Sequence, residues 1–318
     1  LVTGGRASGS ARVLEGFIND RTTQGGKMRK STIWIALVAL VAIASPAVAK
    51  GKAHPKLVEM NEALAAMGSE VRVEYAEYIT SADGPEFGQT IFANDRGNKQ
   101  LGADWVPGDP RRGGFTDIAW ITDLTEPCGD VSAQQMEDAI ANAMNTWQGV
   151  QCSEIPLTWL GNYNIDFGVV QFILGFGGNP GFFTDLTHAG FLPREFFDFL
   201  TPGGGDFILG VTFTFVWTAD PDMDGNGKSD VAFREIYYND EFDWNIDANY
   251  DIETVVLHET GHGLSQAHFG KIFRTDSNGK VHFSPRAVMN AAYSGVQQEL
   301  TGTDVGGHCS NWGSWPNN

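Results

Sequence analysis

Two histidines four residues apart, with a glutamate directly after the first, are the side chains of this 318-residue chain best suited to do chemistry: His258, Glu259 and His262. Residues four apart on a helix project from the same face, so both imidazoles can bind one ion. Zinc binds neutral imidazole nitrogens at about 2.0–2.1 Å. Glu259 follows the first ligand on the same helix, near enough to a metal-bound water to take its proton. The spacing therefore predicts a zinc site with a general base.

A catalytic zinc also needs a third protein ligand and one open position for water. His268, ten residues after His258, is the expected third ligand, and it reaches the metal only if the chain turns sharply after Leu264. A downstream glutamate such as Glu299 is the alternative third ligand. Either set would leave one coordination position open, as hydrolytic chemistry requires.

The segment from His258 to His268 resembles the zinc signature H-E-x-x-H-x-x-G-x-x-H of the metzincin metallopeptidases, in particular of secreted bacterial matrixins. Downstream, RAVMNAAY resembles the family's Met-turn, with Met289 below the zinc and Tyr293 four residues later. NAMNTW resembles the end of the first helix of matrixin catalytic domains, and EIYYNDEFDW resembles the segment that leads to the zinc helix. The resemblance covers about residues 113–310. It implies an α+β, zincin-like catalytic domain, in which a twisted mixed sheet packs on a few helices and the zinc helix lies at the cleft.

The function that this resemblance implies is that of a secreted zinc endopeptidase acting on proteins or peptides. Bound zinc lowers the pKa of its water to about 7 and polarises the scissile carbonyl. Glu259 would accept the proton and deliver it to the leaving amine. Met289 would form an apolar floor, and Tyr293 would line the substrate pocket. The alternative is a calcium-stabilised surface or adhesion protein with a non-catalytic zinc site, although structural zinc usually has four protein ligands.

The sequence departs from the family pattern in three ways. Ser265 stands where the family has a glycine whose left-handed conformation makes the turn toward the third ligand, so either Ser265 adopts that conformation or Gly263 bends earlier. The long interval from His268 to Met289 is expected to hold an inserted hairpin with a two-residue Asn278-Gly279 turn. Residues 50–112 contain no cysteine, so the cysteine-switch motif of matrixin zymogens is absent.

A second metal site is expected in the segment ADPDMDGNGKSD, which precedes the zinc helix. Its oxygen-bearing side chains alternate around Gly225, as in the first half of an EF-hand loop. Val231 replaces the bidentate glutamate that closes such a loop. We expect bound calcium here, with a solvated acidic turn as the alternative. The expected ligands are Asp220, Asp222, Asp224, Asn226 and Asp230.

His188 lies in the region where matrixins place a structural metal. The resemblance implies that it binds such a metal, with Asp185 or Asp206 as a partner, and a loop histidine without a metal is the other interpretation.

The charge and the N-terminal pattern limit the function and the location. With 21 Lys and Arg against 39 Asp and Glu, the net charge of −18 argues against a nucleic-acid partner. Residues 28–49 have a basic start, an apolar stretch and an Ala47-Val48-Ala49 cleavage site, the layout of a secretory signal peptide. We therefore expect a secreted protein, most simply a monomer, without a membrane anchor once the signal is removed.

The expected organisation follows from these boundaries. Residues 1–27 are interpreted as an upstream, non-native segment, residues 50–112 as a leader with a linker, and residues 113–318 as the catalytic domain. Export permits disulfides. Cys128 and Cys152 flank an amphipathic helical segment and are expected to form one, leaving Cys309 unassigned.

Overall fold

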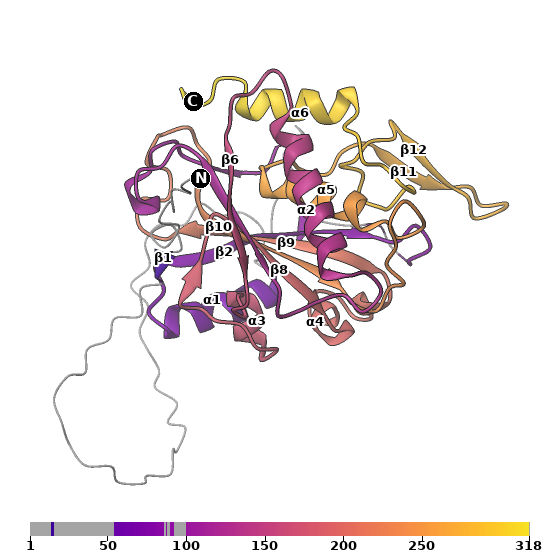
Figure 1. Ribbon diagram of the computed structural model, residues 1–318, viewed down its shortest axis with the longest axis horizontal. Helices are drawn as coiled ribbons and strands as arrows, with labels where there is room; N and C mark the ends of the chain where they lie inside the picture. The colour runs from indigo at the N-terminus through magenta and orange to yellow at the C-terminus, as the bar shows by residue number, and fades with distance from the viewer. Residues whose placement is uncertain (1–13, 16–53, 86, 88–89, 92–99, 318) are drawn as a thin grey trace, which may run out of the picture.

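Runs of β-branched and aromatic residues form the strands of one eight-stranded mixed sheet (Figure 1). The computed structural model describes residues 14–15, 54–85, 87, 90–91 and 100–317. The strand order is β3-β2-β9-β10-β8-β5-β6, and β4 pairs with β10. The strands are β2 (Val71–Thr80), β3 (Thr90–Ile91), β4 (Ala103–Asp104), β5 (Ile118–Asp123), β6 (Leu157–Tyr163), β8 (Leu186–Leu192), β9 (Ile208–Trp217) and β10 (Ser229–Asn239).

Strand direction divides the sheet into two parts. Strands β10, β8, β5 and β6 are mutually parallel, whereas β9 is antiparallel to both β10 and β2. Every residue of β9 is buried, because helices cover both faces of the sheet. These observations establish the expected α+β architecture of a mixed sheet packed on helices.

Two helical layers enclose this sheet (Figure 1). Helices α2 (Ala133–Gln148) and α5 (Ile252–Gly263) lie on one face, with α6 (Gly302–Trp312) above them. The opposite face carries helix α1 (Pro55–Ala66) and the short helices α3 (Val169–Leu174) and α4 (Arg194–Asp198). Outside these layers lie two 3-10 turns, η2 (Pro110–Arg112) and η3 (Gly204–Asp206), and a short ribbon of β1 (Leu14–Glu15) and β7 (Phe182–Phe183).

Helix α2 forms where the apolar spacing predicts it. Ser132 and Gln135 make a reciprocal capping box at its start. Its buried stripe, which includes Met136 and Trp147, faces α5, and the Trp147 indole donates to the Leu257 carbonyl at 2.8 Å. The two long helices of this layer are therefore joined by packing and by a buried hydrogen bond.

The leader expected over residues 50–112 packs, where the structure describes it, against the domain expected over residues 113–318, and its role as a leader stays a prediction. Strand β2 lies inside the main sheet, paired with β9 from Val71 opposite Trp217 to Thr80 opposite Ile208. Its sequence, VRVEYAEYIT, is rich in β-branched and aromatic residues, and most of its side chains are buried. Further along, the Leu101 amide donates to the Ser265 carbonyl. The segment therefore packs as part of the same structure.

The expected disulfide between Cys128 and Cys152 is also wrong. Cys152 pairs with Cys309 of α6, with Cα atoms 5.6 Å apart, and Cys128 is a buried free thiol. Cys128 precedes α2 and Cys152 follows it. A helix of 16 residues is about 24 Å long, so its two flanks are too far apart for a disulfide.

The expected hairpin between His268 and Met289 is confirmed. Strands β11 (Lys271–Arg274) and β12 (Val281–Ser284) pair antiparallel and project from the body of the molecule (Figure 1). The Thr275 amide donates to the Lys280 carbonyl, and Gly279 has a left-handed φ of 68°. The connection is therefore longer than the expected two-residue turn.

The structure does not test the interpretation of residues 1–27 and 28–49. The expected signal peptide lies outside the described residues, as does nearly all of the upstream segment. Among the residues that are described, no helix combines the length and the apolar character needed to cross a membrane.

We expect the double substitution Cys152→Ser and Cys309→Ser to lower the free energy of unfolding by about 2–5 kcal/mol, because this disulfide restrains a long loop in the unfolded chain. Urea denaturation measures the loss, and Cys128→Ser is the control that leaves the disulfide intact. Peptide mapping without reductant should recover Cys152 joined to Cys309. A peptide joining Cys128 to Cys152 would contradict the structure.

Candidate metal centre

Helix α5 carries the first two histidines and is buried along almost its whole length. Asp251 caps its start by accepting from the Thr254 amide and hydroxyl, at 2.9 and 2.6 Å. The helix must also approach its neighbours closely at Gly261, where an added Cβ would lie 2.3 Å from the Met289 sulfur. Glycine is therefore required where the helix crosses the turn at Met289.

The sharp turn after α5 is made by Ser265 itself, in a left-handed conformation with φ 63°. Gly263 lies within the helix, so the earlier bend does not occur. Arg234 stabilises the turn by donating to the Gly263 carbonyl at 2.7 Å and to the Ser265 hydroxyl at 3.0 Å. These contacts offset the conformational cost of a serine at this position and direct the chain back toward α5.

The turn brings three imidazoles together. The Nε2 atoms of His258, His262 and His268 lie 3.0, 3.1 and 3.1 Å from one another. His258 Nδ1 lies 2.7 Å from the Val288 carbonyl, and His262 Nδ1 lies 2.8 Å from the Gln266 carbonyl. Because a carbonyl only accepts, Nδ1 carries the hydrogen on these two rings and their Nε2 lone pairs face the centre of the group.

The three rings are held in the neutral form that metal binding requires. Burial lowers the pKa of His258 to about 4. Burial, followed by the neighbouring imidazoles, lowers the pKa of His262 and His268 well below the ordinary value. Converging lone pairs repel unless a cation lies between them. Tetrahedral zinc places its nitrogen ligands roughly 3.3 Å apart, so this donor set fits zinc with a small expansion.

Glu259 lies beside the histidines on α5 and is fully buried. Its Oε2 accepts from the Thr212 hydroxyl at 2.6 Å, and its Oε1 accepts from the Ile79 amide at 3.3 Å. Burial raises the pKa of Glu259 to about 8, although these two hydrogen bonds oppose the shift. The sequence gives no sign of Ile79 or Thr212 as partners, because β2 and β9 are far from α5 along the chain.

The segment around Met289 is held by a residue that sequence reasoning missed. The Asp304 carboxylate, buried at the start of α6, accepts from the amides of Val288 and Met289, each at 3.1 Å. The Val288 carbonyl in turn accepts from His258. Asp304 is therefore a positioning residue for the first histidine. In the sequence, only the capping-box spacing from Thr301 to Asp304 indicates that this carboxylate lies at the start of a helix.

The remaining residues predicted for this site have structural contacts. The Tyr293 hydroxyl accepts from the Asp251 amide at 3.0 Å, so the ring is tied to the start of α5. Glu299 is exposed and lies outside the histidine group, so the structure brings together His268 and not Glu299 with His258.

The acidic segment gathers only part of the predicted calcium shell. Carboxylate oxygens of Asp222, Asp224 and Asp230 lie within 4.8 Å of one another. One oxygen each of Asp222 and Asp230 is buried without a hydrogen-bond partner. Burial is the largest cause of the raised pKa of Asp224 and Asp230. Two buried acceptors without donors, beside a third carboxylate, fit a bound cation such as calcium.

Two of the five expected ligands are used otherwise. Asp220 is exposed and outside this carboxylate group, and its backbone carbonyl accepts from Arg111 at 2.7 Å, so its role as a ligand stays a prediction without support from the structure. The Asn226 amide donates to Asp224 at 3.0 Å and to Asp104. Sequence reasoning missed Asp104, which also pairs with Lys228 at 3.0 Å.

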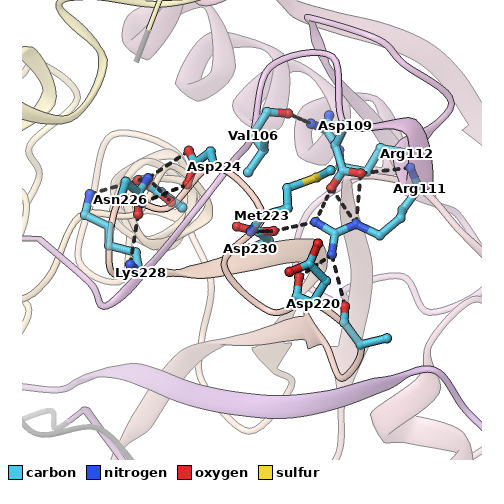
Figure 2. Close-up of polar contacts among 12 residues, drawn as sticks. Val106, Asp109, Arg111, Arg112, Asp220, Met223, Asp224, Asn226, Lys228 and Asp230 are labelled. Carbon is cyan, nitrogen blue, oxygen red and sulfur yellow. Dashed lines mark hydrogen bonds and ion pairs between the residues drawn. The ribbon is translucent and has the colours of Figure 1, made fainter.

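Arg111 supplies positive charge to the same loop, as Figure 2 shows. Its guanidinium contacts both Asp109 and Asp230. Arg111 lies in the segment that is expected to hold a leader with a linker. The guanidinium compensates part of the negative charge, but it contacts only one oxygen of Asp230 and leaves the other without a partner.

Among the described residues, His188 belongs to no cluster of three or more potential metal ligands, and its expected role in a structural metal site stays a prediction. It lies on β8, fully buried, with Nδ1 2.8 Å from the Tyr238 hydroxyl. Burial lowers its pKa to about 3, so it stays neutral. The two acids expected beside it bind elsewhere: Asp185 pairs with Arg112 and Asp206 with Arg194.

Comparison of the chain with models of known protein families and with curated proteins finds no match. The functional assignment therefore depends on the geometry of the site and on the motifs described above.

We expect Asp304→Ala to weaken zinc binding about 10–100-fold, because Val288 then no longer holds His258 in place. Competition with a chromophoric chelator measures the affinity, and circular dichroism checks that the variant is folded. Glu299→Ala is the matched control and should bind zinc as the wild type does. Unchanged affinity in Asp304→Ala would contradict the positioning role.

We expect calcium to stabilise the protein by about 2–3 kcal/mol when present at a hundredfold excess over its Kd. Asp230→Asn should abolish the shift in melting temperature, because it removes charge from the buried acceptor pair. Asp220→Asn should retain the shift. A wild-type melting curve unaffected by calcium would rule the site out.

Proposed function

We propose that this chain is a secreted zinc endopeptidase of the metzincin type, similar to matrixins, that hydrolyses peptide bonds in proteins or peptides. The observation that carries the proposal is the convergence of three neutral Nε2 atoms within 3.1 Å, with Glu259 next in sequence to the first histidine. No other His, Cys, Asp or Glu of the described residues joins the group, so a zinc ion bound there would have three protein ligands and a fourth position for water.

Each residue of the site has a definite part in this chemistry. His258, His262 and His268 would hold the zinc, and bound zinc would supply an acidic water and a polarised carbonyl. Glu259 accepts a proton from the water and donates it to the departing amine. Its raised pKa means that the carboxyl group retains a proton readily, and a cation on the adjacent histidines favours the carboxylate form. Thr212 orients the group through its hydroxyl.

The surrounding structure supports the proposal in two respects. The mixed sheet packed on helices, with α5 against β9, is compatible with the zincin-like fold that the resemblance implies. The disulfide between Cys152 and Cys309 is compatible with an oxidising compartment, and so with secretion.

One observation favours the alternative of a calcium-stabilised surface or adhesion protein with a non-catalytic zinc site. Glu259 is fully buried, and both of its oxygens accept from groups of its own chain. In this arrangement no external substrate reaches the carboxylate, so the two functions differ in whether this enclosure ever opens.

We expect Glu259→Gln in the zinc-loaded protein to reduce hydrolysis of a denatured protein substrate about 10²–10⁴-fold while zinc stays bound, because the amide cannot accept the proton. Zinc content is measured by metal analysis. Glu253→Gln, on the same helix, is the control and should keep its activity. A zinc chelator should abolish activity in the wild type, and full activity of Glu259→Gln would refute the assigned mechanism.

A further inference from the structure

The hairpin of β11 and β12 lies between His268 and Met289 in the chain, and its base is fixed to the backbone around Met289. The Phe269 amide donates to the Met289 carbonyl at 3.1 Å. The Asn290 side-chain amide donates to the carbonyls of Phe269 and Pro285, at 3.0 and 3.1 Å, so it joins the two ends of the hairpin. The base of the hairpin is therefore held beside the histidine group.

One face of the hairpin is turned toward the body of the protein. Arg274 on this face donates to the Ala82 carbonyl at 2.7 Å and to the Gly84 carbonyl. Its guanidinium also lies 5.1 Å from the centre of the Phe87 ring. Because side chains alternate along a strand, the neighbouring positions point away from the body.

The outward face consists of Lys271, Phe273, Lys280 and His282. Phe273 is 54% exposed, lies opposite His282 in the ladder and stacks on its ring, with centroids 4.9 Å apart. The Thr275 hydroxyl lies 2.7 Å from His282 Nε2, and the Thr275 amide donates to the Lys280 carbonyl. The alternation therefore continues past β11, and an exposed lysine flanks the aromatic pair at each end.

The charge of this segment is opposite to that of the whole chain. Residues 269–286 contain four cationic residues and one acidic residue, namely Lys271, Arg274, Lys280, Arg286 and Asp276. Elsewhere, every lysine or arginine that the structure describes pairs with a carboxylate, except the buried Arg234. The four cations of the hairpin segment make no such pair with a described residue.

The spacing of the outward face defines what it can bind. A strand rises about 3.3 Å per residue, so the two lysines lie roughly 13 Å apart along the hairpin, with the aromatic pair midway. An extended polypeptide repeats its side chains with the same period, so carboxylates four residues apart with an apolar residue between them would match all three positions. The net charge of −18 would repel such a segment from the rest of the protein.

We propose that the outward face is a docking surface for acidic segments of the polypeptides that the protein cleaves, with an apolar residue packed on Phe273 and a carboxylate beside each lysine. The inference rests on the proposed function, which it narrows to substrates of this composition. Phe273 follows His268 by five residues, so their Cα atoms lie at most about 18 Å apart. A docked chain therefore needs a connection of only a few residues to reach the histidine group.

Charge reversal on the outward face tests this inference in the zinc-loaded, full-length protein. The probe is a fluorescein-labelled nonapeptide with glutamate at its third and seventh positions, leucine at the fifth and serine elsewhere, and its binding is followed by fluorescence anisotropy. Lys271→Glu and Lys280→Glu should each raise the Kd about threefold or more, because an attraction becomes a repulsion. Phe273→Ala should also raise the Kd, because the leucine loses its contact. All three side chains are exposed, so the variants should fold.

Matched controls separate docking from general attraction between charges. Lys56→Glu makes the same change of charge on α1, where the lysine already pairs with Glu59, and should leave the Kd unchanged. A probe with glutamine in place of both glutamates should not bind. A probe with its two glutamates adjacent keeps the charge and loses the spacing, so it should bind more weakly.

Three outcomes would overturn the docking surface. In the first, the Kd is the same in wild type, Lys271→Glu and Lys280→Glu. In the second, Lys56→Glu weakens binding as much as they do. In the third, the wild type binds heparin but not the glutamate probe, which would assign the face to a sulfated polysaccharide.

Hydrolysis is a separate measurement. A longer peptide that carries the acidic segment should have a lower KM than its glutamine version, with the same kcat, because docking adds binding without changing the chemistry. If neither peptide is hydrolysed while the probe binds as expected, the proposed function fails and the docking surface stands.

Discussion

Three nitrogen lone pairs that point at one another form an unfavourable arrangement without a cation, and much of the structure around α5 serves to maintain it. Backbone carbonyls of Val288 and Gln266 fix the hydrogen of two rings on the far nitrogen. Burial keeps the rings neutral, since their protonation would place positive charges together inside the protein. The repulsion destabilises the metal-free fold, and a bound cation would relieve it, so the site is preorganised for a metal.

The turn after α5 is the second requirement of this arrangement, because it brings His268 back to the helix. Four side chains bind the carbonyls or the hydroxyl of residues 263–265. Arg234 and the Trp105 indole both donate to the Gly263 carbonyl, at 2.7 and 3.0 Å. The Trp312 indole donates to Leu264, and the Asn311 amide to Ser265. A buried cation at the carboxyl end of the helix also opposes the negative end of its dipole. The left-handed serine is thus held by contacts from three distant parts of the chain.

The sequence allowed prediction of the parts of the site that are local. Four-residue spacing placed His258 and His262 on one face of a helix, and the signature placed His268 after a turn. The apolar periodicity of α2 and the existence of the β11–β12 hairpin were also predictable. Contacts between distant segments were not. The residues around Cys128 and Cys152 give no indication that Cys152 lies beside Cys309 of α6. The linker-like composition around Arg111 likewise gives no indication of its contact with Asp230. The place of β2 in the sheet depends on pairing with β9, which no local pattern specifies.

Helix α6 is fastened at both of its ends, by Asp304 to the backbone beneath the histidines and by Cys309 to the chain beyond α2. The disulfide and the Asp304 carboxylate restrain the same helix, so we expect the stability of the disulfide and the position of the histidine group to be linked. Because such linkage is reciprocal, reduction of the disulfide would lower the affinity of the site for a cation, and a bound cation would make the disulfide harder to reduce. Oxidative maturation and metal uptake would then reinforce each other during folding.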